Sequence, residues 1–305
     1  MIKAEMVTKT FENFHALDNI SCRIPKGCIY GMVGSNGAGK STFLRLLTGV
    51  YKSDGGTIRI DDEEVYNNPA VKNKIAYVPD ELYFLPGSTM ERMGTLYGEI
   101  YPAFDKDYYQ YLADSFQLDL KKPIHAFSKG MKRQAAAILA ISSKPEYLFF
   151  DETFDGLDPI MRNLVKSFVC RDVLERNTTV IITSHSLREL EDICDQLALL
   201  HKGGLVLESD IQYLKTSLFK IQTAFTRDHN EDSFAAVDIL HYSKKGSVIN
   251  LIARGGQEEI TARIKSMQPL ILDILPLSLE EIFTYEMEAL GYNFQNVLEG
   301  ETNEK

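Results

Sequence analysis

A glycine-rich turn between two apolar runs constrains the fold of this chain more than any other feature. The run Cys28–Val33 is short and apolar, as in a buried strand. The next nine residues, Gly34–Thr42, fit the pattern G-x-x-x-x-G-K-[ST], and the segment Thr42–Leu47 continues with helical character. A strand, a glycine-rich turn and a helix in this order predict an α/β domain with a mostly parallel sheet.

The chemistry of this turn suits a nucleotide. Its glycines allow the backbone to curl so that N–H groups point inward around phosphate oxygens, and the following helix adds its positive N-terminal end. Lys40 supplies a positive charge for the β and γ phosphates, and the Ser41 hydroxyl is placed to hold Mg²⁺. The segment therefore predicts a phosphate-binding loop, or P-loop, for a nucleotide and Mg²⁺. Its predicted binding residues are Gly34, Ser35, Asn36, Gly37, Ala38, Gly39, Lys40, Ser41 and Thr42.

A second carboxylate for the metal follows another apolar run. The apolar run Tyr147–Phe150 is typical of a buried strand, and Asp151 and Glu152 follow it directly. We expect Asp151 to hold Mg²⁺ through water and Glu152 to polarise the attacking water as a general base. Asp-Glu pairs at strand ends are usually just solvated, but the complete P-loop upstream favours the catalytic interpretation.

The rest of the chain divides by pattern. Nine aromatic residues between Tyr83 and Phe116 have helical spacing and indicate a helical insertion over about 82–143. A helix at 159–176, a strand at 178–183 and a helix at 187–194 continue the α/β pattern. After residue 210 we expect a small α+β domain over 211–290, and we expect 291–305 to be a flexible acidic tail. The predicted strands of the small α+β domain are 218–225, 235–242, 247–253 and 270–275, and its predicted helices are 257–267 and 278–290.

Composition narrows the function classes. The net charge is −10 and no long Lys/Arg block occurs, so a nucleic-acid partner is not expected. The four cysteines have no metal-ligand spacing and indicate reduced thiols in the cytosol. No apolar run reaches the roughly 18–20 residues of a membrane span, and the first residues lack the apolar core of a signal peptide.

Five further segments carry a family resemblance. Phe127–Met131 (the signature segment) resembles the LSGGQ signature of ABC ATPases. Asp155–Pro159 resembles that family's D-loop, Thr183–Ser186 its histidine switch and Ile75–Asp80 its Q-loop. Phe11 matches the aromatic residue that stacks on adenine, with Phe14 a nearby competitor and core packing the alternative. The chain thus resembles, over about 1–210, an ABC transporter nucleotide-binding subunit, which implies a P-loop fold with an antiparallel β subdomain and a helical subdomain.

The resemblance also implies a mechanism. Two subunits, either two copies or this chain and a paralogue, would meet head to tail, with each ATP between one P-loop and the partner's signature segment. Asp158 would cross the interface, and His185 would contact the γ-phosphate and orient the water with Glu152, although a histidine at a strand end can also be a satisfied structural residue. The implied signature contacts are Ser128, Lys129, Gly130 and Met131; the catalytic residues are Lys40, Glu152 and His185; and the metal residues are Ser41, Asp80 and Asp151.

Two departures from the family pattern occur. Asp80 stands where the Q-loop has glutamine, so its reach is one methylene shorter and it adds a negative charge. Lys129 and Met131 replace residues of the signature but leave its serine and its second glycine. We expect a working ATPase. These variants resemble bacterial exporter ATPases of the YtrB and ABC-2 types, as does the closing Ser278–Phe283.

An ATPase of this kind must pass its motion to a membrane partner. The resemblance places separate transmembrane permease subunits near Tyr83 and Phe84, while Tyr97 and Tyr101 are better explained by packing in the insertion. The chain would lie on the cytoplasmic side of the membrane, attached through that partner. An importer subunit and a soluble, non-transport ABC ATPase remain alternatives. A GTPase would need Asn-Lys-x-Asp, whereas the Asn-Lys at 73–74 continues with Ile-Ala.

Overall fold

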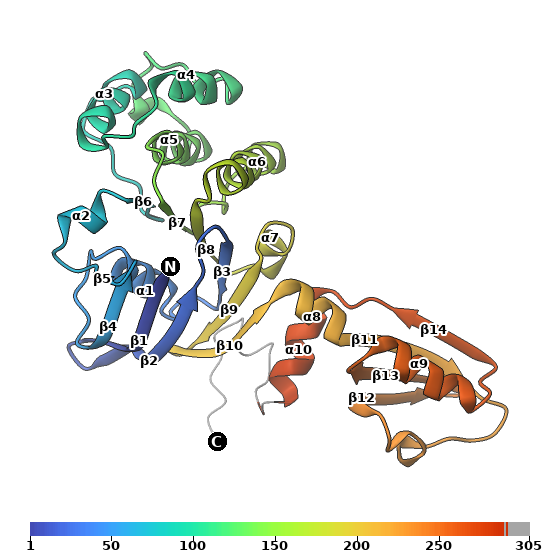
Figure 1. Cartoon of the computed structure of the whole chain (residues 1–305). Helices are drawn as coiled ribbons and strands as arrows, with labels where there is room; N and C mark the ends of the chain where they lie inside the picture. Colours follow the sequence, from blue (N-terminus) through green and yellow to red (C-terminus); the bar gives the residue numbers. More distant parts are fainter. Residues whose placement is uncertain (290, 292–305) are drawn as a thin grey trace. The chain divides into compact units, whose positions relative to one another are not determined.

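The computed structural model describes residues 1–289 and 291 and divides into two compact units, Met1–Glu208 and Ser209–Lys305 (Figure 1). Within the described residues, no helix has the length and apolar character needed to cross a membrane. The four cysteines form no disulfide. Of the predicted tail at 291–305, all but Gly291 lies outside the described residues.

Two sheets form the body of the first unit. An antiparallel sheet has the order β2-β1-β4-β5, with alternating burial along β2 that is typical of a half-covered sheet. A second, six-stranded sheet has the order β10-β9-β3-β8-β7-β6, and the pairs from β9 to β6 are parallel. The strands of the first sheet are β1 (Ile2–Phe11), β2 (Phe14–Ile24), β4 (Gly55–Ile60) and β5 (Glu63–Glu64). Those of the second are β3 (Ile29–Val33), β6 (Ile75–Val78), β7 (Tyr147–Asp151), β8 (Thr179–Ser184), β9 (Gln196–His201) and β10 (Gly204–Asp210).

Helix α1 (Lys40–Leu47) joins the cores of these two sheets. Its buried Phe43, Leu44 and Leu47 belong to one apolar cluster with residues of both sheets, including Ile2 and Phe149. The short helix α2 (Pro69–Lys72) is capped by Asn68. Because α1 is packed on both sides, the P-loop that precedes it is held on a rigid base.

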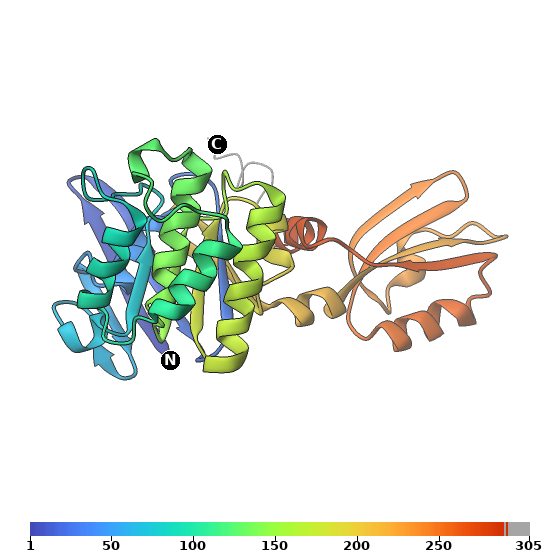
Figure 2. The ribbon, with the colours of Figure 1, turned by 90° about the horizontal axis from the view of Figure 1, so that it is seen from above.

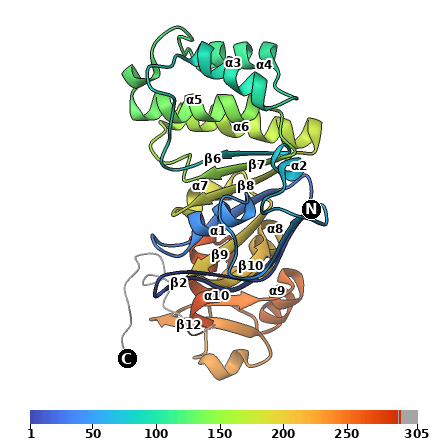
Figure 3. The ribbon, with the colours of Figure 1, turned by 90° about the vertical axis from the view of Figure 1, so that its left-hand side faces the viewer.

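Further helices gather beside β6 and β7 (Figure 3). Tyr109 donates a hydrogen bond to the Met90 carbonyl at 2.7 Å, and the Phe168 ring lies 6.0 Å from the rings of Tyr111 and Phe116. Some aromatic residues of the insertion therefore pack against Phe168, which lies outside it, and others pack against one another, as Phe104 does against Tyr109. These helices are α3 (Met90–Ile100), α4 (Lys106–Ser115), α5 (Lys129–Ser142) and α6 (Pro159–Arg176), with a 3₁₀ turn at Ile124–Ala126. The short helix α7 (Leu187–Glu191) follows β8 and contacts it.

The second unit is an antiparallel sheet of order β12-β13-β11-β14 with α9 along one face (Figure 2). Ile260 and Ile264 of α9 share an apolar cluster with Ile221 and Leu251 of the sheet. The strands are β11 (Leu218–Ala224), β12 (Asp238–Lys245), β13 (Val248–Arg254) and β14 (Ile271–Leu275). The helices are α8 (Ile211–Ser217), α9 (Gln257–Ser266) and α10 (Leu279–Ala289), with a 3₁₀ turn at Glu231–Phe234.

Candidate functional site

The parallel sheet brings the predicted site residues to one edge. Strands β3, β8, β7 and β6 are neighbours in that order, so their carboxyl ends lie side by side. The P-loop follows β3, His185 follows β8, Glu152 follows β7, and Asp80 lies two residues after β6. Segments more than a hundred residues apart in the sequence therefore meet there.

The P-loop has little room for any residue but glycine at two positions. A Cβ on Gly34 would lie 2.3 Å from the Leu200 carbonyl oxygen, and one on Gly39, whose φ is +103°, would lie 2.8 Å from the Ala16 carbonyl oxygen. Lys40 follows and is only 4% exposed. Its ammonium group donates to the carbonyls of Gly34 and Ser35 at 2.6 and 3.1 Å. The loop therefore holds its own lysine head inside the phosphate cradle.

Asp151 is fully buried and is surrounded by hydroxyl groups. Ser41 donates to its Oδ1 at 2.9 Å, Thr183 donates to the same oxygen at 2.7 Å, and Tyr77 donates to Oδ2 at 3.2 Å. Burial and the charge of Asp151 raise the pKa of Tyr77, so its phenol stays protonated and keeps donating. Sequence reasoning assigned no hydrogen bonds to Thr183 or Tyr77, because they contact Asp151 from other strands.

The side chains of Ser41 and Asp151 fit a magnesium ion. Mg²⁺ prefers oxygen ligands and commonly takes one or two from the protein and the rest from water and substrate phosphates. Residues 1–289 and 291 hold no cluster of three or more His, Cys, Asp and Glu residues that would bind a metal by themselves. A hydroxyl and a buried carboxylate 2.9 Å apart beside the P-loop would instead suit an ion that takes its other oxygens from water and a bound nucleotide.

Glu152 lies between a lysine and a histidine. Its Oε1 is 3.1 Å from the Lys40 Nζ, and its Oε2 is 3.1 Å from the His185 Nδ1. Its backbone has a φ of +47°, and its N–H donates to the Thr183 hydroxyl at 3.0 Å. This left-handed conformation turns the carboxylate at the end of β7 toward the P-loop, where it is placed to accept a proton.

Asp80 has a partner that sequence reasoning missed. The guanidinium group of Arg133, in α5, lies 2.9 Å from the Asp80 Oδ1. Its other terminal nitrogen donates to the Glu152 carbonyl at 2.5 Å. The available signal was a charged residue two positions before the apolar run Ala135–Ile141 of a helix, since such a residue, when buried, needs a counter-charge.

A cavity of about 300 Å³ contains much of this site. Phe14 lines it, whereas Phe11 does not and instead packs edge-on against Tyr51 with ring centroids 5.5 Å apart. The pocket therefore presents the competing aromatic residue and not the one that the family pattern selects. Its lining residues are Phe14, Ala16, Asn36, Gly37, Ala38, Gly39, Lys40, Ser41, Thr42, Asp80 and Glu152.

The signature segment and the D-loop do not line this pocket. Ser128 is exposed and caps α5 by accepting from the Met131 N–H at 3.2 Å. Asp158 is exposed and caps α6 by accepting from the N–H groups of Ile160 and Met161, each at 3.1 Å. Lys129 is exposed, and Gly130 and Met131 are half-buried. One chain thus leaves these segments available to another molecule.

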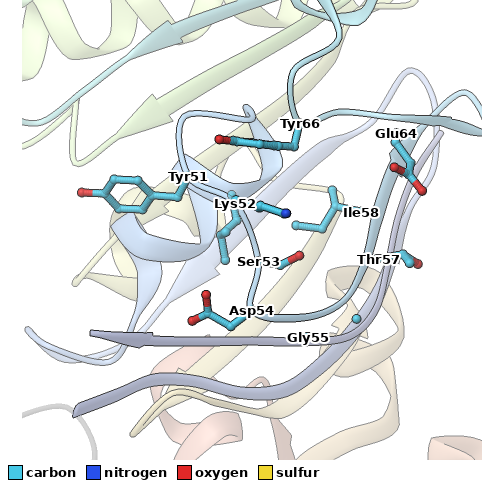
Figure 4. A pocket seen from close by; sticks show the side chains of 11 residues that line it. Tyr51, Lys52, Ser53, Asp54, Gly55, Thr57, Ile58, Glu64 and Tyr66 are labelled. Carbon is cyan, nitrogen blue, oxygen red and sulfur yellow. The ribbon is translucent and has the colours of Figure 1, made fainter. Parts of the chain in front are cut away.

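A separate pocket of about 210 Å³ lies at the segment joining α1 to β4. Figure 4 shows the side chains of Lys52, Asp54 and Tyr66 there. It contains none of the predicted site residues, many of which line the pocket at the P-loop instead.

The fold and the site together define an ATP-binding cassette. Its P-loop lies beside a buried Asp and a Glu-His pair, on a parallel sheet that is joined to an antiparallel sheet and a helical insertion. Residues 17–155 match the family model for the ABC transporter. The chain is 31% identical over 283 residues to the ABC transporter ATP-binding protein YtrB of Bacillus subtilis strain 168, covering 93% of this chain and 97% of that protein. The chain therefore belongs to the ABC transporter ATP-binding proteins and is an ABC transporter ATPase.

Two further similarities agree with this. The bacitracin transport ATP-binding protein BcrA of Bacillus licheniformis is 32% identical over 222 residues, covering 70% of this chain and 71% of that protein. The solved dimeric, post-hydrolysis structure of an ATP-binding cassette bound to ADP and Pi has a TM-score of 0.63 at 19% identity, covering 69% of this chain and 99% of that one. At this identity the second similarity shows the fold alone.

Proposed function

We propose that this chain is the ATP-hydrolysing subunit of a bacterial ABC exporter, closing head to tail with a second cassette on two ATP molecules and driving separate transmembrane subunits. The observation that carries the catalytic part is the position of Glu152. Its carboxylate lies 3.1 Å from both Lys40 and His185, at a phosphate-binding pocket. A general base must lie within reach of the water that it activates and beside the group that fixes the phosphate.

The proposed reaction uses groups that the geometry brings together. The P-loop N–H groups and the Lys40 ammonium bind the β and γ phosphates. When ATP enters, the ammonium therefore gives up its ion pair with the Glu152 carboxylate and pairs with phosphate oxygens. Glu152 takes a proton from water as the water oxygen bonds to the γ-phosphorus and the bond to the β-phosphate oxygen breaks. His185 holds Glu152 and the γ-phosphate in register. Mg²⁺ bound by Ser41 and Asp151 would offset charge on the phosphate oxygens.

Dimer formation completes the site in this proposal. Ser128 and the Gly130 N–H lie at the start of α5, where the helix N-terminus favours an anion. Both lie outside the pocket that their own chain forms. The dimeric cassette of similar fold, solved with ADP and Pi, supports a second copy or a paralogue as the source of this contact.

The membrane partner is proposed to contact the segment after Asp80. The Tyr83 side chain is 76% exposed and Leu85 is 48% exposed, while Phe84, the other residue predicted for this contact, is half-buried. Exposed aromatic residues are frequent anchors of interfaces. The segment begins at the nucleotide pocket and ends on the surface, so movement at one end reaches the other. Attachment through this partner would hold the chain at the cytoplasmic face of the membrane.

The proposal of export draws on one relative's name. BcrA is named for the transport of bacitracin, whereas the name of YtrB gives neither a cargo nor a direction of transport. In inside-out membrane vesicles that carry this chain and its transmembrane subunits, the cassettes face the added ATP. An exporter then pumps its cargo into the vesicle lumen, where the cargo accumulates. Bacitracin is the first cargo to test, and ATP-driven emptying of preloaded vesicles would instead indicate an importer.

The decisive test of catalysis is Glu152→Gln. We expect kcat for ATP hydrolysis to fall about 100-fold or more, because the amide cannot take a proton from water. ATP binding should persist, so the variant should form an ATP-dependent dimer on size-exclusion chromatography. Glu258→Gln makes the same change at an exposed position in the second unit and should leave kcat unchanged. Wild-type turnover in Glu152→Gln would refute the role of Glu152.

A further inference from the structure

Arg133 is a buried cation at the junction of three segments of the nucleotide-binding unit. It lies in α5, and its side chain is 3% exposed. One terminal nitrogen bonds the Asp80 carboxylate at 2.9 Å, and the other bonds the Glu152 carbonyl at 2.5 Å. Its Nε has no hydrogen-bond partner among the described residues and lies 3.7 Å from where a Cβ on Gly156 of the D-loop would stand.

The two hydrogen bonds of Arg133 connect the segment that begins at Asp80 with the end of β7 at Glu152. Asp80 opens the segment that leads to the exposed Tyr83, while Glu152 stands at the end of β7 and carries the proposed base. A guanidinium group is planar and rigid, so two bonds from its two ends fix both partners in one geometry. Arg133 itself is anchored in the helix that begins with the signature segment.

The charges around the pocket give Arg133 a second effect. Three carboxylates lie at or beside it, those of Asp80, Asp151 and Glu152. Lys40 pairs with Glu152 and Arg133 with Asp80. Without Arg133, the Asp80 carboxylate would face the triphosphate with no cation on it. Its side chain is 47% exposed, so solvent screens part of the repulsion between these like charges but does not remove it.

We propose that Arg133 is a positioning residue of the ATPase site, which neutralises and orients Asp80 and fixes the main chain at Glu152. This inference rests on the proposed function. It gives the Asp80 carboxylate a partner within the chain, in place of the metal role that the sequence suggested. Asp80 and Arg133 thus form an ion pair that links the segment from Asp80 to Tyr83 with Glu152, the proposed general base.

The first test is a double-mutant cycle read by nucleotide binding. A fluorescent ATP analogue is titrated in EDTA, without divalent metal, into the full-length wild type, Arg133→Gln, Asp80→Asn and the double variant. Arg133→Gln should weaken binding about fivefold or more, because one carboxylate is left uncompensated near the triphosphate. Asp80→Asn should bind at least as tightly as the wild type, and the double variant should recover to within about twofold of it.

Turnover supplies a second readout. Arg133→Lys keeps the charge but offers one ammonium group for two partners, so the KM for ATP should stay near wild type while kcat falls about tenfold. Arg171→Gln is the matched control, since Arg171 forms an exposed pair with Glu175 on α6 and should change neither quantity. The Mg²⁺ concentration for half-maximal activity should not rise in Asp80→Asn, whereas a metal ligand at that position would raise it.

Several results would overturn the role of Arg133: nucleotide binding by Arg133→Gln within twofold of wild type, a double variant as weak as Arg133→Gln, or wild-type kcat in Arg133→Lys. Should Arg133→Gln fail to fold, as its circular dichroism and Tm would show, the Arg133→Lys and Asp80→Asn results decide. Failure of the proposed function appears instead in the wild type, which would then bind or hydrolyse no ATP. The variants are compared only with an active wild type, so the two failures are distinguishable.

Discussion

At the scale of single residues, base recognition depends on which aromatic ring faces the P-loop pocket. Phe14 is 62% exposed and lines that pocket, while Phe11 is 40% exposed and packs against Tyr51 and beneath the Lys9 ammonium. We expect Phe14→Ala to raise the Kd for ATP about fivefold or more, since stacking of a base on an aromatic ring contributes about 1–3 kcal/mol.

Phe11→Ala is the matched comparison for this prediction. It removes the same side chain three residues away and should change the Kd about twofold or less. Titration with a fluorescent ATP analogue measures both variants under identical conditions. The reverse order of effects would return the adenine contact to Phe11, as the family pattern assigns it.

The residues that the sequence identifies in this site are those whose position follows from a strand end. Lys40 and Glu152 each come after a buried apolar run, and the family resemblance added His185. All three come together because parallel strands align their carboxyl ends. Arg133 and Tyr77 are different, because their roles depend on which residue of another segment they contact. A one-dimensional pattern gives no register between α5 and the end of β6, which the Arg133 bond needs, or between β6 and β7, which the Tyr77 bond needs, so neither hydrogen bond could be predicted.

At the scale of elements, Asp61 fastens the antiparallel sheet to the parallel one. It follows β4 and accepts hydrogen bonds from Tyr147, at the start of β7, and from the N-terminal ammonium, both at 2.8 Å; Lys26 lies 2.9 Å away. Burial alone would raise the pKa of Asp61, but these donors outweigh it and lower the pKa from 3.8 to about 2. The ionised carboxylate is therefore the form that stabilises the fold.

Asp61→Asn should lower the free energy of unfolding at pH 7. The pKa difference corresponds to at most about 2 kcal/mol, and solvent screening of this partly exposed group reduces the expected loss to about 1 kcal/mol. Because the folded pKa is depressed, the wild-type advantage is complete above the unfolded value of 3.8 and disappears as pH falls toward 2. Urea unfolding at pH 7 and pH 3 measures this change.

Asp62→Asn is the control for Asp61, since Asp62 is the next residue and forms an exposed pair with Lys3. Its substitution should change the unfolding midpoint little at either pH. Equal losses from Asp61→Asn at both pH values would show that the effect is steric and does not arise from the carboxylate charge.

Sequence patterns predicted most elements of the chain, and their misses have physical causes. The helix expected at 159–176 is α6 to the residue, because Asp158 caps it, proline opens it and Asn177 ends it in the left-handed conformation. The helix expected at 187–194 ends at Glu191. The strand expected at 235–242 begins at Asp238, because turn geometry continues past the 3₁₀ turn at Glu231–Phe234, with the Val237 N–H donating to the Phe234 carbonyl at 2.8 Å. Helix α8 was not predicted, since seven residues give too short a period to detect.

At the scale of the whole molecule, the two units have separate apolar cores. Leu200 lies in the core of the first unit, and Leu251 lies in that of the second. Both are fully buried leucines on central strands of their sheets. The residues that we assign to ATP all lie in the first unit. Heating should therefore give two unfolding transitions, of which only the first unit's responds to nucleotide.

Leu251→Ala and Leu200→Ala test this expectation as a pair. Each should lower the stability of its own unit by about 2–5 kcal/mol, since the change removes buried methyl groups and leaves a cavity. ATP at about 100 times its Kd should stabilise the nucleotide-binding unit by about 2.7 kcal/mol. In differential scanning calorimetry, Leu251→Ala should shift the transition that ATP does not move and leave kcat intact, while Leu200→Ala should shift the one that ATP raises. A single transition that both substitutions and ATP move equally would show that the two cores unfold as one, and the second unit would then have to be counted as part of the ATPase.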